Sequence, residues 1–314
     1  MGATPPRSFD ELKEKALEYG RQHGRARLGV AAADDSCALQ AAEDAYKLEL
    51  VEPVLIGHPD RVREAAAQAD VDISNWKLIE APGPIEAARR AVQLVRTKDV
   101  DFLMKGKLGT ADLMRAALDR EAGIRAGRLM SHIALLWTPK LKRLLCMSDG
   151  GIVLNPTLEQ KVDIINNSVD AMHKLGWEKP NVAAVCAFEL VNPAMPQTID
   201  AAALAKMNDR GQIRGCVVDG PFGFDNAISE LAAERKGVTS PVAGKADLVV
   251  FADIDVGNVF YKALYFMAGE SQNAGVLVGS QVPIVMASRA DGADTKRNSI
   301  IVGTVIAHAT MESR

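Results

Sequence analysis

Ser288 and Arg289 begin a short polar segment whose side chains could act together on a phosphorylated substrate. Asp291 and Asp294 complete this segment, which follows the apolar run 284–287. Arginine can hold phosphate through two parallel hydrogen bonds, a serine hydroxyl can donate to a developing oxyanion, and a carboxylate can accept a proton. A plain loop in which an aspartate caps the following helix would have the same composition. The local sequence therefore leaves both interpretations open.

Lys105 lies in a second segment that could bind an anion. Residues 105–110 follow the apolar run 101–104 and lead into a helical pattern, for which Thr110 is the expected N-cap. Backbone N–H groups at the start of a helix, together with Lys105, would form such a site. The residue order of a P-loop, GxxxxGK(S/T), is absent. A solvated lysine beside a helix cap is the simpler interpretation of the local sequence.

Glycine and proline mark two further strand ends in the C-terminal half of the chain. Residues 219–221 end one predicted strand and residues 240–244 precede another. Tight turns of this kind are more often structural than functional. Asn258 and Lys262 are four residues apart, which places them on one face of a predicted helix. That face could bind a ligand or could be plain surface.

The elements that must position these residues alternate along the chain. Apolar runs at 28–33, 53–57, 77–81 and 101–104 are each followed by a helical pattern. This alternation predicts an α/β fold with mainly parallel sheets and helices on both faces. Ligands of such sheets bind outside the carboxyl ends of the strands, where the polar segments described above are expected to lie.

Two apolar runs in the middle of the chain, 131–137 and 143–147, have no helix between them. They predict an antiparallel pair and a domain boundary. The length of 314 residues also favours two domains, because a single core rarely grows beyond about 250–300 residues. Since the C-terminal helix can return to the first domain, we predict a discontinuous first α/β domain, 1–128 plus 280–314, and a second α/β domain, 129–279.

The composition excludes several classes of partner. Hydrophobic residues make up 48% and charged residues 25% of the chain, which is typical of a globular protein. Aromatic residues at 5% and a net charge of −3 argue against nucleic acid and anionic lipid. No apolar run approaches the ~18 residues of a membrane span, and no signal peptide is evident at the N-terminus. We therefore expect a cytoplasmic protein without nucleic-acid or membrane partners.

Cysteine and histidine show no metal-binding pattern. The four cysteines form no CxxC pair, and the five histidines include no HExxH motif. We therefore expect neither a metal nor a redox cofactor.

The chain contains a series of short sequence strings that resemble motifs of the phosphate acetyl/butyryltransferase family. The strings also follow one another in the order and spacing of that family. The strings occupy residues 110–115, 155–156, 219–221, 240–244, 257–262 and 288–289. The similarity extends over nearly the whole chain beyond about residue 25 and is densest between residues 191 and 307. The stretch from 191 to 227 looks closer to the phosphate butyryltransferase branch than to the acetyl branch.

The resemblance implies a fold and a reaction. The fold is the two-domain α/β architecture shared with isocitrate and isopropylmalate dehydrogenases, with the active site in an interdomain cleft and usually a dimeric assembly. A homodimer or a higher homo-oligomer is expected. The reaction is a direct transfer in which the thiolate of coenzyme A attacks the carbonyl carbon of an acyl phosphate and phosphate leaves. Coenzyme A is a substrate, and no further cofactor is implied.

The resemblance also implies roles for individual residues. Ser288 matches a serine that hydrogen-bonds the substrate carbonyl, and Arg289 matches an arginine that stabilises phosphate and developing negative charge. The catalytic aspartate of the acetyl branch falls on Thr295, so the general base is either Asp294, which we favour, or Asp291. The expected substrate-binding residues are Lys105, Arg115, Asn155, Ser240, Gly244, Asn258 and Lys262.

Two other functions fit parts of the sequence. An NAD- and metal-dependent hydroxyacid-phosphate dehydrogenase of the same architecture could use Asp219, Asp225, Asp253 and Asp255 as metal ligands, although no GxGxxG motif follows a strand. A non-catalytic protein that binds coenzyme A or phosphate would show no phosphorolysis of a thioester. Acyl phosphate formation measured against nicotinamide reduction separates the two enzymes.

Overall fold

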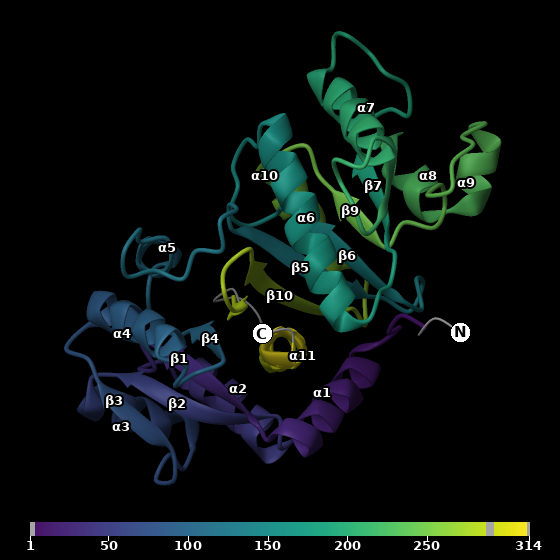
Figure 1. The fold of residues 1–314 in the computed structure, drawn as a ribbon. Coiled ribbons are helices and arrows are strands. Elements are labelled where there is room, and N and C mark those ends of the chain that lie inside the picture. The colour runs from purple at the N-terminus through teal and green to yellow at the C-terminus, as the bar shows by residue number, and fades with distance from the viewer. Residues whose placement is uncertain (1–3, 287–291, 313–314) are drawn as a thin grey trace. The chain divides into compact units, whose positions relative to one another are not determined.

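The computed structural model describes residues 4–286 and 292–312. The chain forms two compact units, which are treated separately below (Figure 1). The first unit comprises Phe9–Arg128 and Ala274–Arg314, and the second comprises Met1–Ser8 and Leu129–Asn273. None of the described helices is both long enough and apolar enough to span a membrane.

The first unit contains a mainly parallel sheet with the strand order β3-β2-β1-β4-β11-β10. Its strands are β1 (Ala26–Ala31), β2 (Val51–Gly57), β3 (Lys77–Glu80), β4 (Phe102–Lys105), β10 (Gln272–Val278) and β11 (Ile284–Val285). β10 is antiparallel to β11, and the other pairs in this unit are parallel. β1 is buried at nearly every position, as expected for a parallel strand covered on both faces.

Helices connect and cover the strands of the first unit. They are α1 (Phe9–His23), α2 (Ser36–Lys47), α3 (Pro59–Ala69), α4 (Pro84–Arg96), α5 (Thr110–Ala117) and α11 (Ala293–Glu312). The expected cap at Thr110 is wrong by one position, because Gly109 is the N-cap of α5 and Thr110 is its first helical residue. α11 packs closely on β4 and β11, since a Cβ at Gly303 would approach Phe102 and Val285 to 2.9 Å.

The second unit has the strand order β5-β6-β9-β7-β8. Its strands are β5 (Ser131–Trp137), β6 (Leu144–Ser148), β7 (Asn181–Val185), β8 (Val217–Phe222) and β9 (Leu248–Val250). β5 and β6 are antiparallel, as predicted, and the remaining pairs are parallel. The helices of this unit are α6 (Leu158–Leu175), α7 (Pro196–Asp209), α8 (Phe224–Ile228), α9 (Glu230–Arg235) and α10 (Ile254–Met267). An α/β fold with mainly parallel pairing is thus confirmed.

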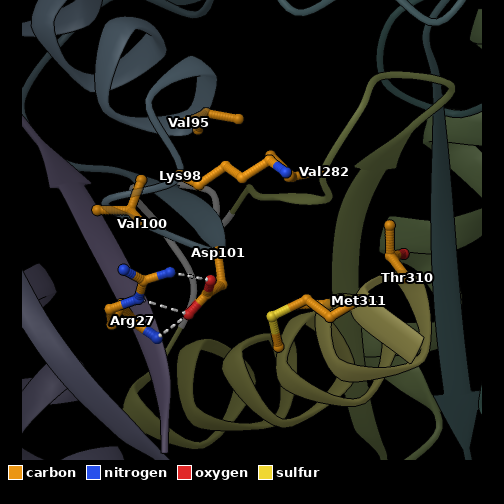
Figure 2. A pocket seen from close by; sticks show the side chains of 9 residues that line it. Arg27, Val95, Lys98, Val100, Asp101, Val282, Thr310 and Met311 are labelled. Atoms are coloured by element: carbon orange, nitrogen blue, oxygen red, sulfur yellow. Dashed lines mark hydrogen bonds and ion pairs between the residues drawn. The ribbon is translucent and has the colours of Figure 1, made fainter. Parts of the chain in front are cut away.

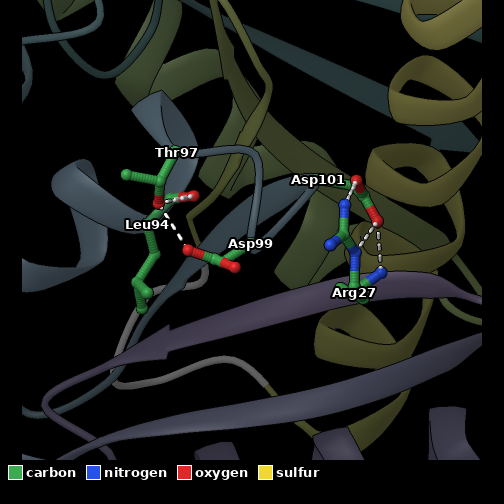
Figure 3. Close-up of polar contacts among 5 residues, drawn as sticks. All are labelled: Arg27, Leu94, Thr97, Asp99 and Asp101. Carbon is green, nitrogen blue, oxygen red and sulfur yellow. Dashed lines mark hydrogen bonds and ion pairs between the residues drawn. The ribbon is translucent and has the colours of Figure 1, made fainter.

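A charged pair joins the amino ends of β1 and β4 in the first unit (Figure 3). Asp101 Oδ2 accepts hydrogen bonds from the Arg27 backbone N–H at 2.7 Å and from Nε at 3.0 Å, while Oδ1 accepts from Nη2 at 2.7 Å. The Asp101 side chain is only 8% exposed. The hydrogen bond to Asp101 raises the pKa of Arg27.

Asp101→Ala is expected to lower the free energy of unfolding by about 1.5–3 kcal/mol, because the substitution removes three charge-assisted hydrogen bonds. Urea denaturation measures this loss. Asp99→Ala is the control, since Asp99 lies two residues away and accepts an exposed hydrogen bond from Thr97 Oγ1 at 2.5 Å (Figure 3). Equal stabilities of the two variants would contradict a structural role for the pair.

Candidate active site

The cavity beside the Arg27–Asp101 pair is a poor candidate for an active site. Its volume is about 200 Å³, and it lies at the amino ends of β1 and β4, where Figure 2 shows Arg27 turned toward Asp101. Ligands of parallel α/β sheets bind at the opposite, carboxyl ends of the strands. The guanidinium fork of Arg27 is moreover already occupied by Asp101. We therefore do not consider this cavity a candidate binding site.

A larger cavity of about 470 Å³ lies at the carboxyl ends of β1 and β4. The register of the two strands places Ala31 opposite Lys105, so the loops that follow them start side by side. The charged residues of its wall are Asp34, Asp35, Lys105, Lys107 and Lys296. The excess of lysine over aspartate favours an anionic ligand.

Lys105 reaches this wall through a tight turn at the end of β4. The Gly106 N–H donates to Ala31 O and the Lys107 N–H donates to Ala32 O, each at 2.8 Å. The Lys105 ammonium donates to the carbonyl oxygens of Gly106 and Leu108, each at 3.2 Å. The turn thus holds the Lys105 charge next to the cavity.

The start of α2 forms another part of the same wall. Asp35 caps this helix, since its Oδ1 accepts a hydrogen bond from the Ala38 N–H at 3.0 Å. Ser36 and Ala38 of the first helical turn line the cavity. The first N–H groups of a helix have no intrahelical acceptor and carry partial positive charge. No motif in the sequence marked this helix start as part of a site.

Two other expected residues of the first unit do not line this cavity. The Arg115 side chain is 72% exposed and forms an ion pair with Asp112 at 2.7 Å. The Asp294 side chain, in the first turn of α11, is 79% exposed and pairs with Arg297 at 2.8 Å. Ser288, Arg289 and Asp291 lie outside the described residues, so their predicted roles stay predictions.

In the second unit, Asn258 is hydrogen-bonded to the loop that contains Asn155. Asn258 Nδ2 donates to Gly150 O at 2.8 Å, and the Ile254 N–H donates to Leu154 O at 3.0 Å. The start of α10 and the loop after β6 therefore form one cluster of expected substrate-binding residues. Lys262 is exposed one turn further along α10.

Asp149 organises this loop from within. It is 3% exposed, and its Oδ1 accepts hydrogen bonds from the N–H groups of Gly151 and Ile152 at 2.7 and 2.9 Å. Its Oδ2 accepts from the His132 N–H of β5 at 2.8 Å. A Cβ at Gly257 would lie 2.4 Å from the Asp149 carbonyl oxygen, so α10 packs directly on this turn. No motif in the sequence marked Asp149 as a functional or structural residue.

Asp149→Ala is expected to cost about 3 kcal/mol or more of unfolding free energy, because backbone donors would lose their charged acceptor in a buried site. Chemical denaturation tests this value. The control is Glu234→Ala, which removes an exposed carboxylate from α9 and should change stability by less than about 0.5 kcal/mol. A comparably small change in Asp149→Ala would contradict the structural role.

The segment from Ser240 to Gly244 is a tight turn before β9. Ser240 Oγ accepts a hydrogen bond from the Val242 N–H at 3.1 Å, and Gly244 has a φ of +73°. A Cβ at Gly244 would lie 2.5 Å from the Glu230 backbone nitrogen. These contacts give both residues a structural role, and their expected contact with substrate stays a prediction.

Two of the four aspartates considered as metal ligands have other contacts. Asp253 caps α10 by accepting a hydrogen bond from the Val256 N–H at 3.0 Å, and Asp225 pairs with Lys236 at 3.2 Å. Within residues 4–286 and 292–312, no group of three or more histidine, cysteine, aspartate or glutamate side chains could hold a metal ion.

Comparison with known proteins agrees with the resemblance seen in the sequence. The family model for phosphate acetyl/butaryl transferases matches residues 84–304. A phosphate butyryltransferase from Clostridium acetobutylicum is 44% identical, covering 96% of this chain and 98% of that protein. A phosphate acetyltransferase from Thermotoga maritima is 45% identical, covering 94% and 99%.

Solved structures show the same fold. A branched-chain phosphotransacylase from Enterococcus faecalis has a TM-score of 0.80 at 26% identity and covers 90% of this chain and 99% of that chain. A putative 4-hydroxythreonine-4-phosphate dehydrogenase from Salmonella typhimurium has a TM-score of 0.55 at 14% identity, covering 91% and 99%, which is a likeness of fold alone. Because the family model and the relatives match most of its length, this chain belongs to the phosphate acetyl/butyryltransferase family.

Proposed function

We propose that this chain is a phosphate acyltransferase that moves a short acyl group between coenzyme A and inorganic phosphate. The observation that carries the proposal is 44–45% identity, over nearly the full length, to enzymes named phosphate butyryltransferase and phosphate acetyltransferase. The lysine-rich cavity at the carboxyl ends of β1 and β4 supports it, because the reaction uses only phosphate-bearing substrates.

The proposed reaction needs no covalent acyl-enzyme. The thiol of coenzyme A loses its proton to a carboxylate, and the thiolate attacks the carbonyl carbon of the acyl phosphate. A new C–S bond forms, the C–O bond to phosphate breaks, and phosphate leaves with the bonding electron pair. Ser288 would donate a hydrogen bond to the carbonyl oxygen, and Arg289 would bind the departing phosphate. The reverse direction uses the same groups.

Arg289 would also help to form the nucleophile. In water, the pKa of a thiol lies ~4 pH units above that of a carboxylic acid, so a carboxylate alone is a poor base for this step. A cation within ~4–6 Å favours the thiolate and narrows that gap.

The remaining site residues and the assembly belong to the same proposal. Lys105, Arg115, Asn155, Ser240, Gly244, Asn258 and Lys262 would contact the substrates. We further propose the two-domain architecture of isocitrate and isopropylmalate dehydrogenases with an interdomain cleft, a homodimer or higher homo-oligomer, a cytoplasmic location, and no metal or cofactor besides the substrates.

Replacing each candidate base separately is expected to identify the proton acceptor. Asp294→Asn should lower kcat/KM by about 10²–10⁴-fold and remove the acidic limb of its pH profile, since an amide cannot take the thiol proton. Asp291→Asn serves as the matched variant and should keep the wild-type kcat/KM and the acidic limb of the pH profile. The reverse result would transfer the role to Asp291.

The function itself is tested with a panel of acetyl-, propionyl-, butyryl- and isobutyryl-CoA. Phosphate-dependent release of free thiol, together with acyl phosphate formation, is the expected result for at least one of them. The acyl chain with the highest kcat/KM then defines the specificity. Tight acyl-CoA binding without thiol release would contradict the proposal in favour of a binding protein, and nicotinamide reduction would do so in favour of a dehydrogenase.

A further inference from the structure

Lys296 is a buried lysine that faces the cavity at the carboxyl ends of β1 and β4. Its relative exposure is 9%, and it belongs to the first turn of α11 while lining the cavity together with Lys105 and Lys107. Among the residues that the structure describes, none accepts a hydrogen bond or forms an ion pair with its ammonium group. A lysine that is largely withdrawn from water without a counter-charge is less favourable than one with an anionic partner.

Lys161, the other buried lysine among the described residues, provides the contrast. Lys161 is 6% exposed, and its Nζ lies 2.7 Å from Asp200 Oδ2. There the buried ammonium has a carboxylate partner within the protein. Lys296 has none in the described part of the chain, although Asp34 and Asp35 line the same cavity. The Asp35 carboxylate is engaged with the Ala38 N–H of α2.

The position of Lys296 in its helix adds to the excess of positive charge. The first turn of a helix carries partial positive charge from its free N–H groups and therefore disfavours a lysine. The start of α2 also contributes to the wall of this cavity, through Ser36 and Ala38. Violations of such local rules are expected where a protein binds a ligand, because the ligand supplies the missing interaction. The charges of this wall therefore favour an anion beside Lys296.

We propose that Lys296 binds the phosphate group that is transferred in the reaction, an inference that rests on the proposed function. Lys296 lines the lysine-rich cavity at the carboxyl ends of β1 and β4, which is the edge of a parallel sheet where substrates bind. An ammonium reaching the phosphate group from α11 offsets part of its negative charge and makes phosphate a better leaving group in the acyl phosphate direction. It makes inorganic phosphate bind more tightly in the opposite direction.

The test compares Lys296→Met, which preserves length without charge, with Lys296→Gln and Lys296→Arg. In the phosphorolysis of acyl-CoA, Lys296→Met is expected to raise the KM for inorganic phosphate by about 10- to 100-fold, the range of one charge-assisted hydrogen bond. The KM for acyl-CoA should stay within about twofold. Lys296→Arg should recover part of the loss, because it restores the charge. Lys77→Met, on the exposed strand β3 of the same unit, is the matched control.

A binding measurement accompanies the kinetics. Inorganic phosphate alone should raise the Tm of the wild type and of Lys77→Met, because a ligand that binds only the folded state stabilises it. The shift should vanish in Lys296→Met and in Lys296→Gln. Without phosphate, Lys296→Met should be at least as stable as the wild type, since it replaces a largely buried lysine that has no partner in the described part of the chain.

The outcomes separate this inference from the proposed function. A wild type that is stabilised by phosphate through Lys296 but transfers no acyl group would overturn the function and leave the phosphate site. An unchanged KM for phosphate and an unchanged Tm shift in Lys296→Met would overturn the inference while leaving the function. A rise confined to the KM for acyl-CoA would also overturn it, because Lys296 would then bind a phosphate of coenzyme A.

Discussion

Arg289→Lys is expected to lower kcat/KM for acyl transfer by about 10²–10³-fold, the effect of losing one preorganised group that stabilises transition-state charge. A lysine keeps the charge but offers a single point of contact, whereas the guanidinium presents two parallel donors that match the oxygens of a phosphate. Arg289→Ala should reduce the rate further, because it also removes the cation that favours the thiolate. Steady-state kinetics in both directions measure these effects.

The control for Arg289 is Arg63→Lys in α3. Arg63 is 64% exposed and pairs with Asp60 on the helix surface, so its replacement should leave the kinetics unchanged. Circular dichroism and Tm should show that the Arg289 variants remain folded, since the polar sequence around Arg289 is not expected to form part of the core. Wild-type turnover in folded Arg289→Ala would refute the assignment of this residue.

Gly106→Ala is expected to destabilise the first unit by about 3 kcal/mol or more and to abolish activity. A Cβ at Gly106 would lie 2.1 Å from the carbonyl oxygen and 2.9 Å from the carbonyl carbon of Ala32. Both are backbone atoms, and the Gly106 and Lys107 N–H groups hold the two loops together at 2.8 Å. The clash is relieved only if the ends of β1 and β4 separate. We expect this separation to cost more unfolding free energy than an added methyl group usually costs in a core.

A second glycine of the same unit provides a control, because its replacement by alanine is expected to raise the stability instead of lowering it. A Cβ at Gly20, within α1, would meet only Glu49 O at 3.8 Å. Gly20→Ala should therefore stabilise the protein by about 0.5–1 kcal/mol, because alanine loses less backbone entropy in a helix. Guanidinium denaturation of both variants gives the comparison. Equal effects of the two substitutions would show that the turn after β4 tolerates a side chain.

The placement of strands and of their pairing was predictable because it depends on local patterns. The apolar run 131–137 is β5, and its antiparallel pairing with β6 follows from the short connection between them. The run 101–104 is β4, shifted by one residue to Phe102–Lys105. Parallel pairing elsewhere follows from helices that connect successive strands. The expected cap at Thr110 failed because Gly109 has the extended backbone that an N-cap requires.

The site was predictable only in part. Lys105 was singled out because it follows a strand directly, and it does line the cavity at the strand ends. Lys296 and Asp149 were not predicted, because what distinguishes each of them is the burial of its charged side chain, which depends on tertiary contacts. The available signal for Lys296 was a lysine in the first turn of a helix, where acidic residues are preferred. For Asp149, a loop aspartate followed by two glycines gave no sign that its carboxylate would be buried.

The sequence by itself determined the α/β fold, the family and the polar segments that follow the strands, because alternation and short strings are properties of neighbouring residues. Only the tertiary structure decided which charges meet. Asp34, Lys105 and Lys296 are distant in the chain, and the parallel register of β1 and β4 with the packing of α11 brings them to one cavity. Burial and the pairing of charges arise from contacts among such distant segments. The phosphate-binding role of Lys296 could therefore be inferred only from the tertiary structure.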